Sequence, residues 1–216
     1  MEAVGLTHPE ADLTIAPPSL VHLVPGTLVV LEGLDRSGKS TQSAALARLP
    51  WADPAPLFMH LPSGQSRFTE GVYRLTEQAP ISSALARQLM HLACHAENID
   101  TLSEARDCRG AVLDRWWWST VAYGWYGAQL AAQGLDKNAF FGMIDFVWSG
   151  QSADVIFLFT TPHEDDALNR EPVREGYRRL AAEHSTITVE VPSADPATTT
   201  DFLLSTLRER GLVTLS

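Results

Sequence analysis

The sequence predicts an α/β fold with a mostly parallel five-stranded sheet flanked by helices on both faces. Two observations support this prediction. Short apolar segments alternate along the chain with helical segments, a pattern typical of parallel strands joined by covering helices. The first apolar segment also runs into a glycine-rich turn followed by helix formers, an arrangement that presents backbone N–H groups to phosphate.

Five segments have the composition of buried strands. The first precedes the glycine-rich turn and consists of Thr, Leu and Val. The fourth, at residues 153–159, is the clearest of them, and the third ends in an acid. The strands are expected at residues 27–31, 57–60, 111–114, 153–159 and 186–191.

Helical segments separate these strands. Residues 40–48 are rich in helix formers. Phe68, Val72 and Leu75 lie on one side of a helix expected at residues 68–77, and apolar residues recur every three or four positions between residues 81 and 102. Further helices are expected at residues 121–133, 137–148, 166–184 and 198–210, with Gly211 as the stop signal of the last.

Composition excludes several classes of protein. The chain has 216 residues, of which 45% are hydrophobic and 19% are charged, so we expect a folded globular domain. A net charge of −10 disfavours a nucleic-acid or anionic-membrane surface. Two cysteines, Cys94 and Cys108, form neither a disulfide framework nor a zinc pattern, and they favour a cytoplasmic location.

The amino-terminal part differs from the rest of the chain. Residues 1–25 are expected to form an irregular arm, because Pro9 and the Pro17-Pro18 pair break regular structure. Within it, residues 19–25 are apolar enough to pack on the domain as an extra edge segment. The arm lacks the basic and apolar regions of a secretory signal, and no stretch of the chain is long and apolar enough to span a membrane. Residues 26–216 are expected to form the functional domain.

The glycine-rich turn carries the most specific motif. It matches the phosphate-loop (P-loop) pattern G-x-x-x-x-G-K-[ST] at every fixed position, between a strand and a helix. Gly33 and Gly38 allow close backbone approach to phosphate, Lys39 supplies a positive charge, and the Ser40 hydroxyl is a ligand for Mg²⁺. ATP is therefore expected to contact the loop residues Gly33, Ser37, Gly38, Lys39, Ser40 and Thr41.

A second constellation follows the third strand. Asp114 ends this strand, and an acid at that position holds Mg²⁺ directly or through water in nucleoside-triphosphate sites. Arg115 beside it has a planar fork that suits phosphate oxygens. Because ligands bind at the carboxyl ends of strands in parallel sheets, we expect Asp114 and the P-loop to share one site.

These motifs resemble those of the thymidylate kinase (dTMP kinase) family of P-loop kinases. Residues 31–42, LEGLDRSGKSTQ, resemble the opening motif of that family. Residues 113–116, LDRW, followed by residues 119–124, STVAYG, resemble its Asp-Arg-Tyr and Ser-x-x-Ala-Tyr segments. A weaker similarity lies at residues 173–177. The resemblance runs from about residue 27 to the carboxyl terminus and implies a P-loop NTPase fold.

The resemblance implies phosphoryl transfer from ATP, with Mg²⁺ as cofactor, to a deoxynucleoside monophosphate such as dTMP or a related pyrimidine nucleotide. It implies catalytic roles for Arg36, Lys39 and Arg115. On the acceptor side, Asp35 would bind the sugar 3′-hydroxyl, Arg115 the phosphate, and Tyr123 would press on the sugar. Ser119 and Thr120 would face the base, and Arg74 would reach the acceptor phosphate.

The chain departs from the family in three places, of which the first is residues 60–64, where the family's proline is kept but its acidic residue is missing. The family sets an aromatic residue and an arginine against thymine, where the alignment places Cys94 and Asn98 in this chain. A tryptophan of residues 116–118, or Trp125, is a candidate for the missing stacking surface. The lid near residues 163–174 is short, with Arg170 expected to contact ATP, and we expect poorer exclusion of water around the phosphates.

Two alternatives remain open at this point. The first keeps the P-loop chemistry but changes the acceptor to another small molecule. The second is a non-catalytic nucleotide-binding protein whose acceptor site has decayed, which the short lid favours and the retained charged motifs disfavour. Nucleotides are the expected partners, and the resemblance adds a homodimer formed through helices flanking the acceptor site.

Overall fold

The computed structural model describes residues 19–216 and confirms the predicted α/β class. Its main sheet has the strand order β3-β4-β2-β5-β6, and every neighbouring pair is parallel. Strand β2 lies at the centre, and all six of its residues are buried, as expected for a strand covered on both faces. The strands are β2 (Leu28–Gly33), β3 (Leu57–His60), β4 (Ala111–Asp114), β5 (Val155–Phe159) and β6 (Thr188–Glu190).

The register of the sheet brings the expected site residues to one edge. Leu31 in β2 pairs with Asp114 in β4, and Gly33 pairs with Phe159 in β5. His60, the last residue of β3, also pairs with Asp114. The carboxyl ends of the strands therefore meet beside the P-loop, the place where parallel sheets bind ligands.

Two helices cover one face of the sheet. They are α1 (Lys39–Ala47) and α7 (Pro196–Glu209). Leu46 from α1 and Leu203 and Leu207 from α7 pack against Val29 and Leu31 of the central strand. The Asp195 side chain caps the amino terminus of α7, so this helix begins close to the predicted position.

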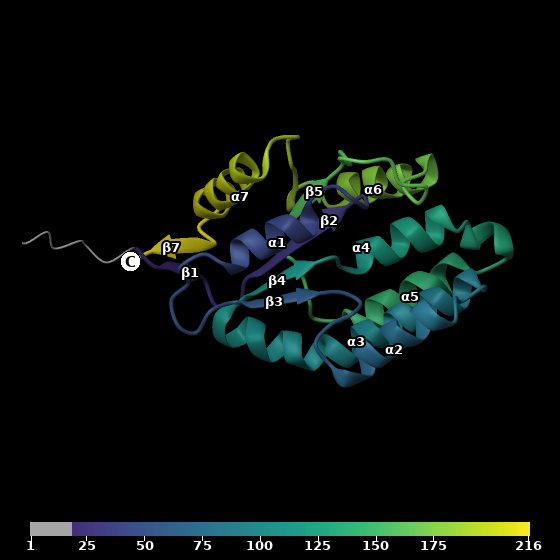
Figure 1. Ribbon diagram of the computed structural model, residues 1–216. Helices are drawn as coiled ribbons and strands as arrows, with labels where there is room; N and C mark the ends of the chain where they lie inside the picture. The colour runs from purple at the N-terminus through teal and green to yellow at the C-terminus, as the bar shows by residue number, and fades with distance from the viewer. Residues whose placement is uncertain (1–18) are drawn as a thin grey trace, which may run out of the picture.

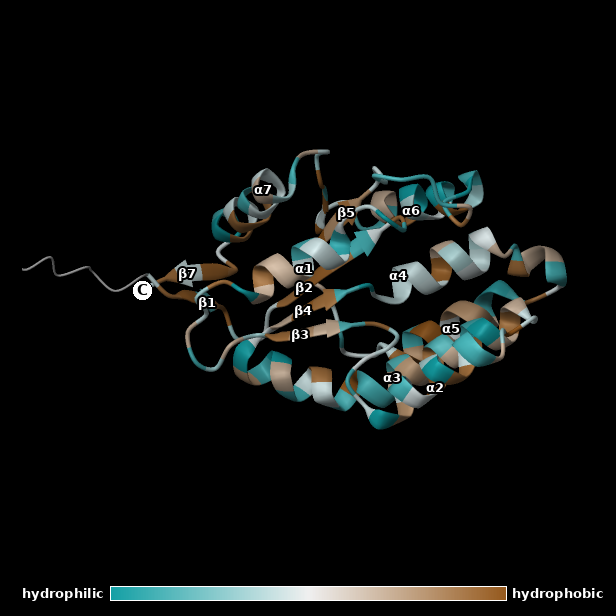
Figure 2. Cartoon of the chain, in the orientation of Figure 1, coloured by the Kyte–Doolittle hydropathy of each residue, from teal (hydrophilic) through white to brown (hydrophobic). Residues whose placement is uncertain are grey.

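A larger group of helices covers the other face (Figure 1). Figure 2 shows β2 and β4 hydrophobic along most of their length, between helices that carry hydrophobic and hydrophilic residues on different sides. Trp118, Phe140 and Tyr177 from this group are buried in one continuous core. The helices are α2 (Arg67–Gln78), α3 (Ala84–Arg109), α4 (Trp117–Ser119), η1 (Thr120–Gly127), η2 (Leu130–Gln133), α5 (Lys137–Val147) and α6 (Glu171–Glu183).

Two predicted helices differ from those observed. The helix expected at residues 121–133 is a π-helix, η1, followed by the 3-10 turn η2, with Gln129 in the left-handed region between them. Gly124 and Gly127 in η1 lie so close to Gln88 and Val173 that a Cβ would collide. The helix expected at residues 166–184 begins only at Glu171, because the preceding residues use their side chains to hold the P-loop.

A small antiparallel sheet lies apart from the main one, at the opposite end of the molecule from α4 in Figure 1. It pairs β1 (Val21–Leu23) with β7 (Val213–Leu215). Within the segment expected to be irregular, residues 21–23 thus form a strand, and the first 18 residues lie outside the described part of the chain. Strand β7 follows Gly211 and was not predicted. No helix within residues 19–216 is long and apolar enough to cross a membrane.

Candidate functional site

The P-loop joins β2 to α1 and is shaped by its glycines. Gly33 has a φ of 131° and lies against β5, where a Cβ would come within 2.0 Å of the Phe159 carbonyl oxygen. Gly38, with a φ of 91°, is the residue from which α1 begins, and no side chain caps this helix. The backbone N–H groups at the start of α1 are therefore free of side-chain partners and are suited to bind an anion.

Lys39 lies beneath the loop and not in solvent. It is 4% exposed, and its ammonium group donates to the Leu34 carbonyl and to the Ser37 hydroxyl, the latter at 3.2 Å. Burial lowers the pKa of Lys39 to about 8, because few solvent molecules remain to stabilise its charge. A phosphate group bound in the loop would restore a counter-charge to this lysine.

Ser40 and Asp114 form the part of the site suited to a metal ion. The Ser40 hydroxyl donates to Oδ2 of Asp114 at 2.6 Å. The other carboxylate oxygen, Oδ1, is buried and has no hydrogen-bond partner among the described residues. A buried carboxylate oxygen beside a hydroxyl fits Mg²⁺, which prefers oxygen ligands and usually keeps several waters and substrate phosphates. Residues 19–216 contain no cluster of three His, Cys, Asp or Glu residues that would hold a metal alone.

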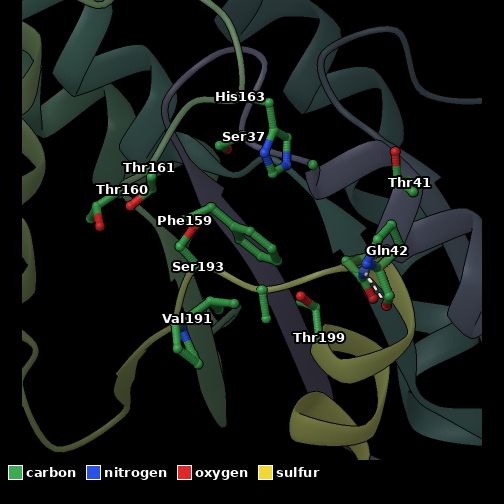
Figure 3. A pocket seen from close by; sticks show the side chains of 14 residues that line it. Ser37, Thr41, Gln42, Phe159, Thr160, Thr161, His163, Val191, Ser193 and Thr199 are labelled. Atoms are coloured by element: carbon green, nitrogen blue, oxygen red, sulfur yellow. Dashed lines mark hydrogen bonds between the residues drawn. The ribbon is translucent and has the colours of Figure 1, made fainter.

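A cavity of about 130 Å³ opens beside the P-loop (Figure 3). The loop and α1 contribute Ser37, Gly38 and Thr41, while the end of β5 and the segment before α7 form the other side. Gln42 is held in place by the Pro196 carbonyl, to which its amide donates at 2.9 Å. Because this cavity lies beside Thr41 at the end of the P-loop, it is the candidate site for the nucleoside of a donor triphosphate.

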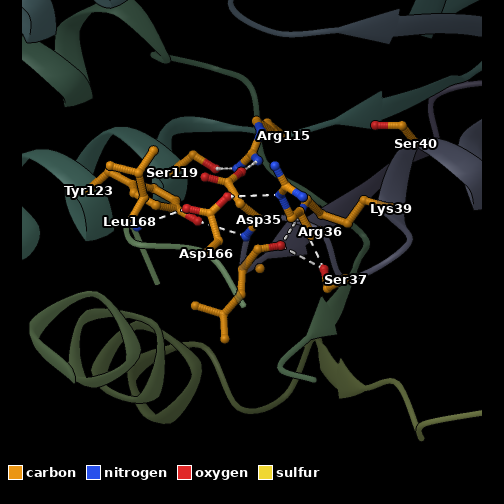
Figure 4. Close-up of polar contacts among 12 residues, drawn as sticks. Asp35, Arg36, Ser37, Lys39, Ser40, Arg115, Ser119, Tyr123, Asp166 and Leu168 are labelled. Atoms are coloured by element: carbon orange, nitrogen blue, oxygen red, sulfur yellow. Dashed lines mark hydrogen bonds and ion pairs between the residues drawn. The ribbon is translucent and has the colours of Figure 1, made fainter. Parts of the chain in front are cut away.

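Asp35 and Arg115 form an ion pair on the other side of the P-loop (Figure 4). Arg115 also donates to the Ser119 hydroxyl at 3.0 Å and lies over the Tyr123 ring. The backbone N–H of Asp35 donates to Tyr123 Oη and to Asn169 Oδ1, both at 2.9 Å. The amide of Asn169 donates in turn to the Asp35 carbonyl at 2.8 Å. These contacts fix the backbone at Asp35, so its carboxylate and the guanidinium of Arg115 face the same space.

That space is a second cavity of about 280 Å³. It is bounded by α3 on one side and by α4, η1 and the start of α6 on the other. Five of the residues expected on the acceptor side line it: Asp35, Arg115, Ser119, Thr120 and Tyr123. The structure therefore gathers most of the predicted acceptor residues around one cavity that adjoins the P-loop, named here the acceptor cavity; the cavity beside Thr41 is named the donor cavity.

Arg36 points toward the lid. Among the four residues that separate Gly33 from Gly38, only Arg36 has a left-handed backbone, with a φ of 57°. Its guanidinium pairs with Glu164 and with Asp166, the latter at 3.2 Å. Its carbonyl accepts from the backbone N–H of His163 at 2.9 Å, which ties the lid segment to the P-loop. These acidic partners raise the pKa of Arg36.

Three predicted site residues are placed elsewhere. Arg74 is exposed on α2 and does not line the acceptor cavity, whereas its neighbour Tyr73 does. Asn98 is buried and holds a loop: its side chain accepts from Gln65 N–H at 3.1 Å and donates to the Cys94 carbonyl at 2.7 Å. Arg170 lines the acceptor cavity and not the donor cavity, and it donates to the Gly127 carbonyl at 3.0 Å.

The α3 residues that line the second cavity differ from those expected to face the base. Cys94 is buried but absent from the cavity wall, and Gln88, His91 and His95 form that wall instead. Of the three consecutive tryptophans, Trp116 lines the cavity and Trp118 does not. The periodicity of α3 gave the helix but not the face that turns toward the cavity, which depends on how α3 packs against η1.

Glu32 is a residue of the site that sequence reasoning missed. It is fully buried at the end of β2. Its carboxylate accepts from the backbone N–H groups of Trp116 and Ser119, at 2.7 and 3.0 Å, and from the hydroxyls of Ser119 and Tyr177, at 2.7 and 3.0 Å. Burial is the largest influence on Glu32 and raises its pKa, while Arg115 and these donors oppose the rise. Glu32 thereby sets the position of the segment that carries Arg115.

Comparisons with known proteins agree on one family. The chain is 30% identical over 170 residues to the thymidylate kinase of Synechococcus sp. strain CC9902, covering 73% of this chain and 77% of that protein. It is 31% identical over 183 residues to a probable thymidylate kinase of Thermococcus kodakarensis, covering 71% of this chain and 83% of that protein. No protein-family model matches the chain.

A solved structure shows the same fold. The crystal structure of thymidylate kinase from Ehrlichia chaffeensis superposes with a TM-score of 0.71. The match covers 85% of this chain and 99% of that one, at 23% sequence identity.

Proposed function

The chain belongs to the thymidylate kinase family, and we propose that the two cavities beside its P-loop bind ATP and dTMP, or a related pyrimidine deoxynucleotide. The enzyme is a nucleoside monophosphate kinase that transfers the terminal phosphoryl group of ATP to the acceptor phosphate. The observation that carries the assignment of sites is the position of the P-loop between the two cavities, with Asp114 and Arg115 at the same sheet edge.

On the donor side, the P-loop backbone and Lys39 hold the phosphates of ATP. Gly33, Ser37, Gly38, Ser40 and Thr41 belong to the same segment, three of them on the wall of the donor cavity. Because the loop already presents N–H groups and a buried ammonium, little reorganisation is needed when phosphate binds. Arg170, expected from the sequence to contact ATP, lines the acceptor cavity, so we assign it to the acceptor side instead.

The Ser40 hydroxyl and the unpartnered Oδ1 of Asp114 would hold Mg²⁺. When bound there, the ion neutralises phosphate charge that would otherwise oppose the transfer. The residues themselves supply a rigid pair of oxygens, because Asp114 is fixed in β4 and Ser40 at the start of α1.

On the acceptor side, the Arg115 guanidinium binds the phosphate and Asp35 the sugar hydroxyl. The two side chains form an ion pair in the structure. When the nucleotide binds, Arg115 exchanges the Asp35 carboxylate for the acceptor phosphate, and Asp35 exchanges the guanidinium for the sugar hydroxyl. Tyr123 and Asn169 hold the Asp35 backbone throughout. Such transfer is mostly a matter of positioning and charge neutralisation, which a preformed cluster of this kind provides.

Arg36 is the residue that stabilises charge on the transferred group. It lies in the P-loop, and its present partners are two lid acids, the exposed Glu164 and the partly buried Asp166, which a phosphate would displace. Residues 26–216 form the kinase domain in this proposal, with residues 163–174 as a short lid.

We also propose a homodimer that forms through α3 and α5, the helices beside the acceptor cavity. Leu89 on α3 is 42% exposed and Phe146 on α5 is 83% exposed, and an apolar groove lies between them. A second copy of this face would cover both side chains. Sedimentation of the wild type as a dimer and of Phe146→Asp as a monomer is the expected result.

The two free cysteines and the cytoplasmic supply of ATP favour a cytoplasmic location.

The experiment that tests the function incubates the full chain with ATP, Mg²⁺ and a panel of dTMP, dUMP, dCMP, dAMP and dGMP. Formation of dTDP with ADP, lost in Lys39→Ala, is the expected result. If no nucleoside diphosphate forms from any acceptor, the proposed function is wrong.

A further inference from the structure

The wall of the acceptor cavity formed by α3 contains polar groups that have no partner within the protein. Gln88 is 3% exposed, and its Oε1 has no hydrogen bond among the described residues. Trp116, 4% exposed, has an unpartnered Nε1–H on the same cavity. Leaving a buried polar group unpaired is unfavourable, because the group loses its hydrogen bonds to water and gains none in the protein. Two such groups on one cavity indicate a ligand edge that hydrogen-bonds there.

His95 adds a third group, and its polarity is fixed. It is 2% exposed and lines the same cavity. The indole N–H of Trp148 points at its Nδ1 at 3.4 Å. Because an indole N–H can only donate, Nδ1 must be the unprotonated nitrogen, and the ring proton resides on Nε2. Burial also keeps the ring neutral, with a pKa of about 3. His95 therefore offers the cavity a donor and not an acceptor.

Gln88 is adaptable where His95 is not. Its carboxamide presents a carbonyl or an NH₂ group depending on how it is turned, and it packs against η1 at Gly124, where a Cβ would come within 2.6 Å of it. Gln88 can thus match either a ring N–H or a bare ring nitrogen. Discrimination between bases must come from a group that cannot change its polarity.

We propose that His95, held as an Nε2–H donor by Trp148, reads the carbonyl at position 4 of the acceptor's pyrimidine and so selects 4-oxo bases (thymine, uracil) over cytosine. The assignment rests on the proposed function, because Arg115 and Asp35 fix the phosphate and sugar and hence the depth of the base. His95 is among the most buried residues of the wall, and position 4 is the ring position remote from the sugar. The amino group of cytosine would meet the N–H of His95 donor to donor.

Trp148 is a positioning residue in this account. It touches His95 and Trp116 but does not line the cavity itself. Without its N–H, the proton of the His95 ring can move to Nδ1, and Nε2 becomes an acceptor for an amino group. The consequence is a change of selectivity and not only a loss of activity.

The experiment measures kcat/KM for dTMP and dCMP with wild type, Trp148→Phe and Trp118→Phe. Trp118 is the control, since it is a buried tryptophan whose indole N–H has no partner among the described residues and which lies away from the cavity. The ratio of dTMP to dCMP turnover should fall at least about 10-fold in Trp148→Phe, with dCMP turnover rising, and should stay unchanged in Trp118→Phe; discrimination of this size matches one reversed hydrogen bond. An unchanged ratio in Trp148→Phe overturns the inference while the kinase function stands.

A second variant guards against misfolding of Trp148→Phe. His95→Gln places a freely turning amide at the same position, so it should bind dCMP more tightly than wild type does in equilibrium titrations, with dTMP weakened. If His95→Gln keeps the wild-type preference, the inference is wrong. If the wild type phosphorylates no nucleotide, the proposed function and this inference fail together.

Discussion

Ser40 and Asp114 lie 2.6 Å apart in hydrogen-bond contact, and the second oxygen of the Asp114 carboxylate is buried without a partner. The pair joins the first turn of α1 to the end of β4, two elements 74 residues apart in sequence. A buried, incompletely paired carboxylate is costly for stability, and such costs are typical of residues retained for function.

Asp114→Asn therefore should separate activity from stability. The amide keeps the contact with Ser40 but loses the charge that attracts Mg²⁺. We expect kcat/KM to fall at least about 100-fold and the Mg²⁺ concentration for half-maximal rate to rise. Thermal unfolding of the ligand-free variant should occur at the same or a higher temperature than that of wild type. A variant that loses stability but keeps its Mg²⁺ dependence would contradict the metal role.

Arg36→Ala should reduce kcat by about 1000-fold, at the lower end of the effect of arginines that stabilise charge in phosphoryl transfer. The KM for dTMP should change little, because Arg36 lies on the lid side of the loop and not on the acceptor cavity. Arg179→Ala is the control: this arginine is equally exposed and pairs with Glu175. Steady-state kinetics of the two variants measure this effect. Equal losses of kcat in both variants would show that Arg36 has no specific role in phosphoryl transfer.

The stability of the ligand-free protein should depend on the ionisation of Lys39. Its pKa is about 8 in the folded protein against 10.5 in the unfolded chain, so the folded state binds fewer protons between these values. The free energy of unfolding should then rise with pH from 8 to 10.5, by roughly 3 kcal/mol in total. Below pH 8 both states are protonated, and the cost of burying the charge is fully present.

Denaturant unfolding at pH 7.5 and 10 measures this effect. Lys39→Met should lack the rise that wild type shows, whereas Lys137→Met, which alters the only other lysine of the chain, should keep it. If wild type and Lys39→Met show the same pH dependence, Lys39 is not charged and buried in the folded protein.

Asn98 should behave as a structural residue. Asn98→Ala leaves the Gln65 N–H without its acceptor and removes the additional side-chain donor to the Cys94 carbonyl, which should lower the free energy of unfolding by about 1–3 kcal/mol. The preference for dTMP over dCMP should remain that of wild type. Asn138→Ala, at an exposed asparagine of α5, serves as the control for stability. A change in the preference for dTMP over dCMP in Asn98→Ala would show that Asn98 contributes to base recognition.

Much of the donor side follows from sequence because it is local. Gly33, Lys39 and Ser40 belong to one contiguous loop, and the strand and helix around it fix their geometry. Asp114 and Arg115 could be placed in the same site because parallel strands end at one edge of the sheet, and the register of β2 with β4 confirms that edge.

The acceptor wall was less predictable because it depends on how a long helix is rotated. Residues 81–102 show the period of a helix, but Cys94 and His95 are adjacent, and only packing against η1 and α5 decides which one faces the cavity. The same holds for Arg74 and Tyr73 on α2. The role of Glu32 could not be predicted from sequence, because its partners lie 84 to 145 residues away along the chain. These partners are Trp116, Ser119 and Tyr177.

Phosphoryl transfer is tested most directly by ³¹P NMR of a mixture of the full chain, ATP, Mg²⁺ and dTMP. We expect dTDP and ADP to appear in equal amounts without free phosphate, and Arg115→Ala to slow their appearance at least about 100-fold, since one ion-paired phosphate contact is lost. Release of inorganic phosphate without dTDP, or no change in ATP at all, would contradict this expectation.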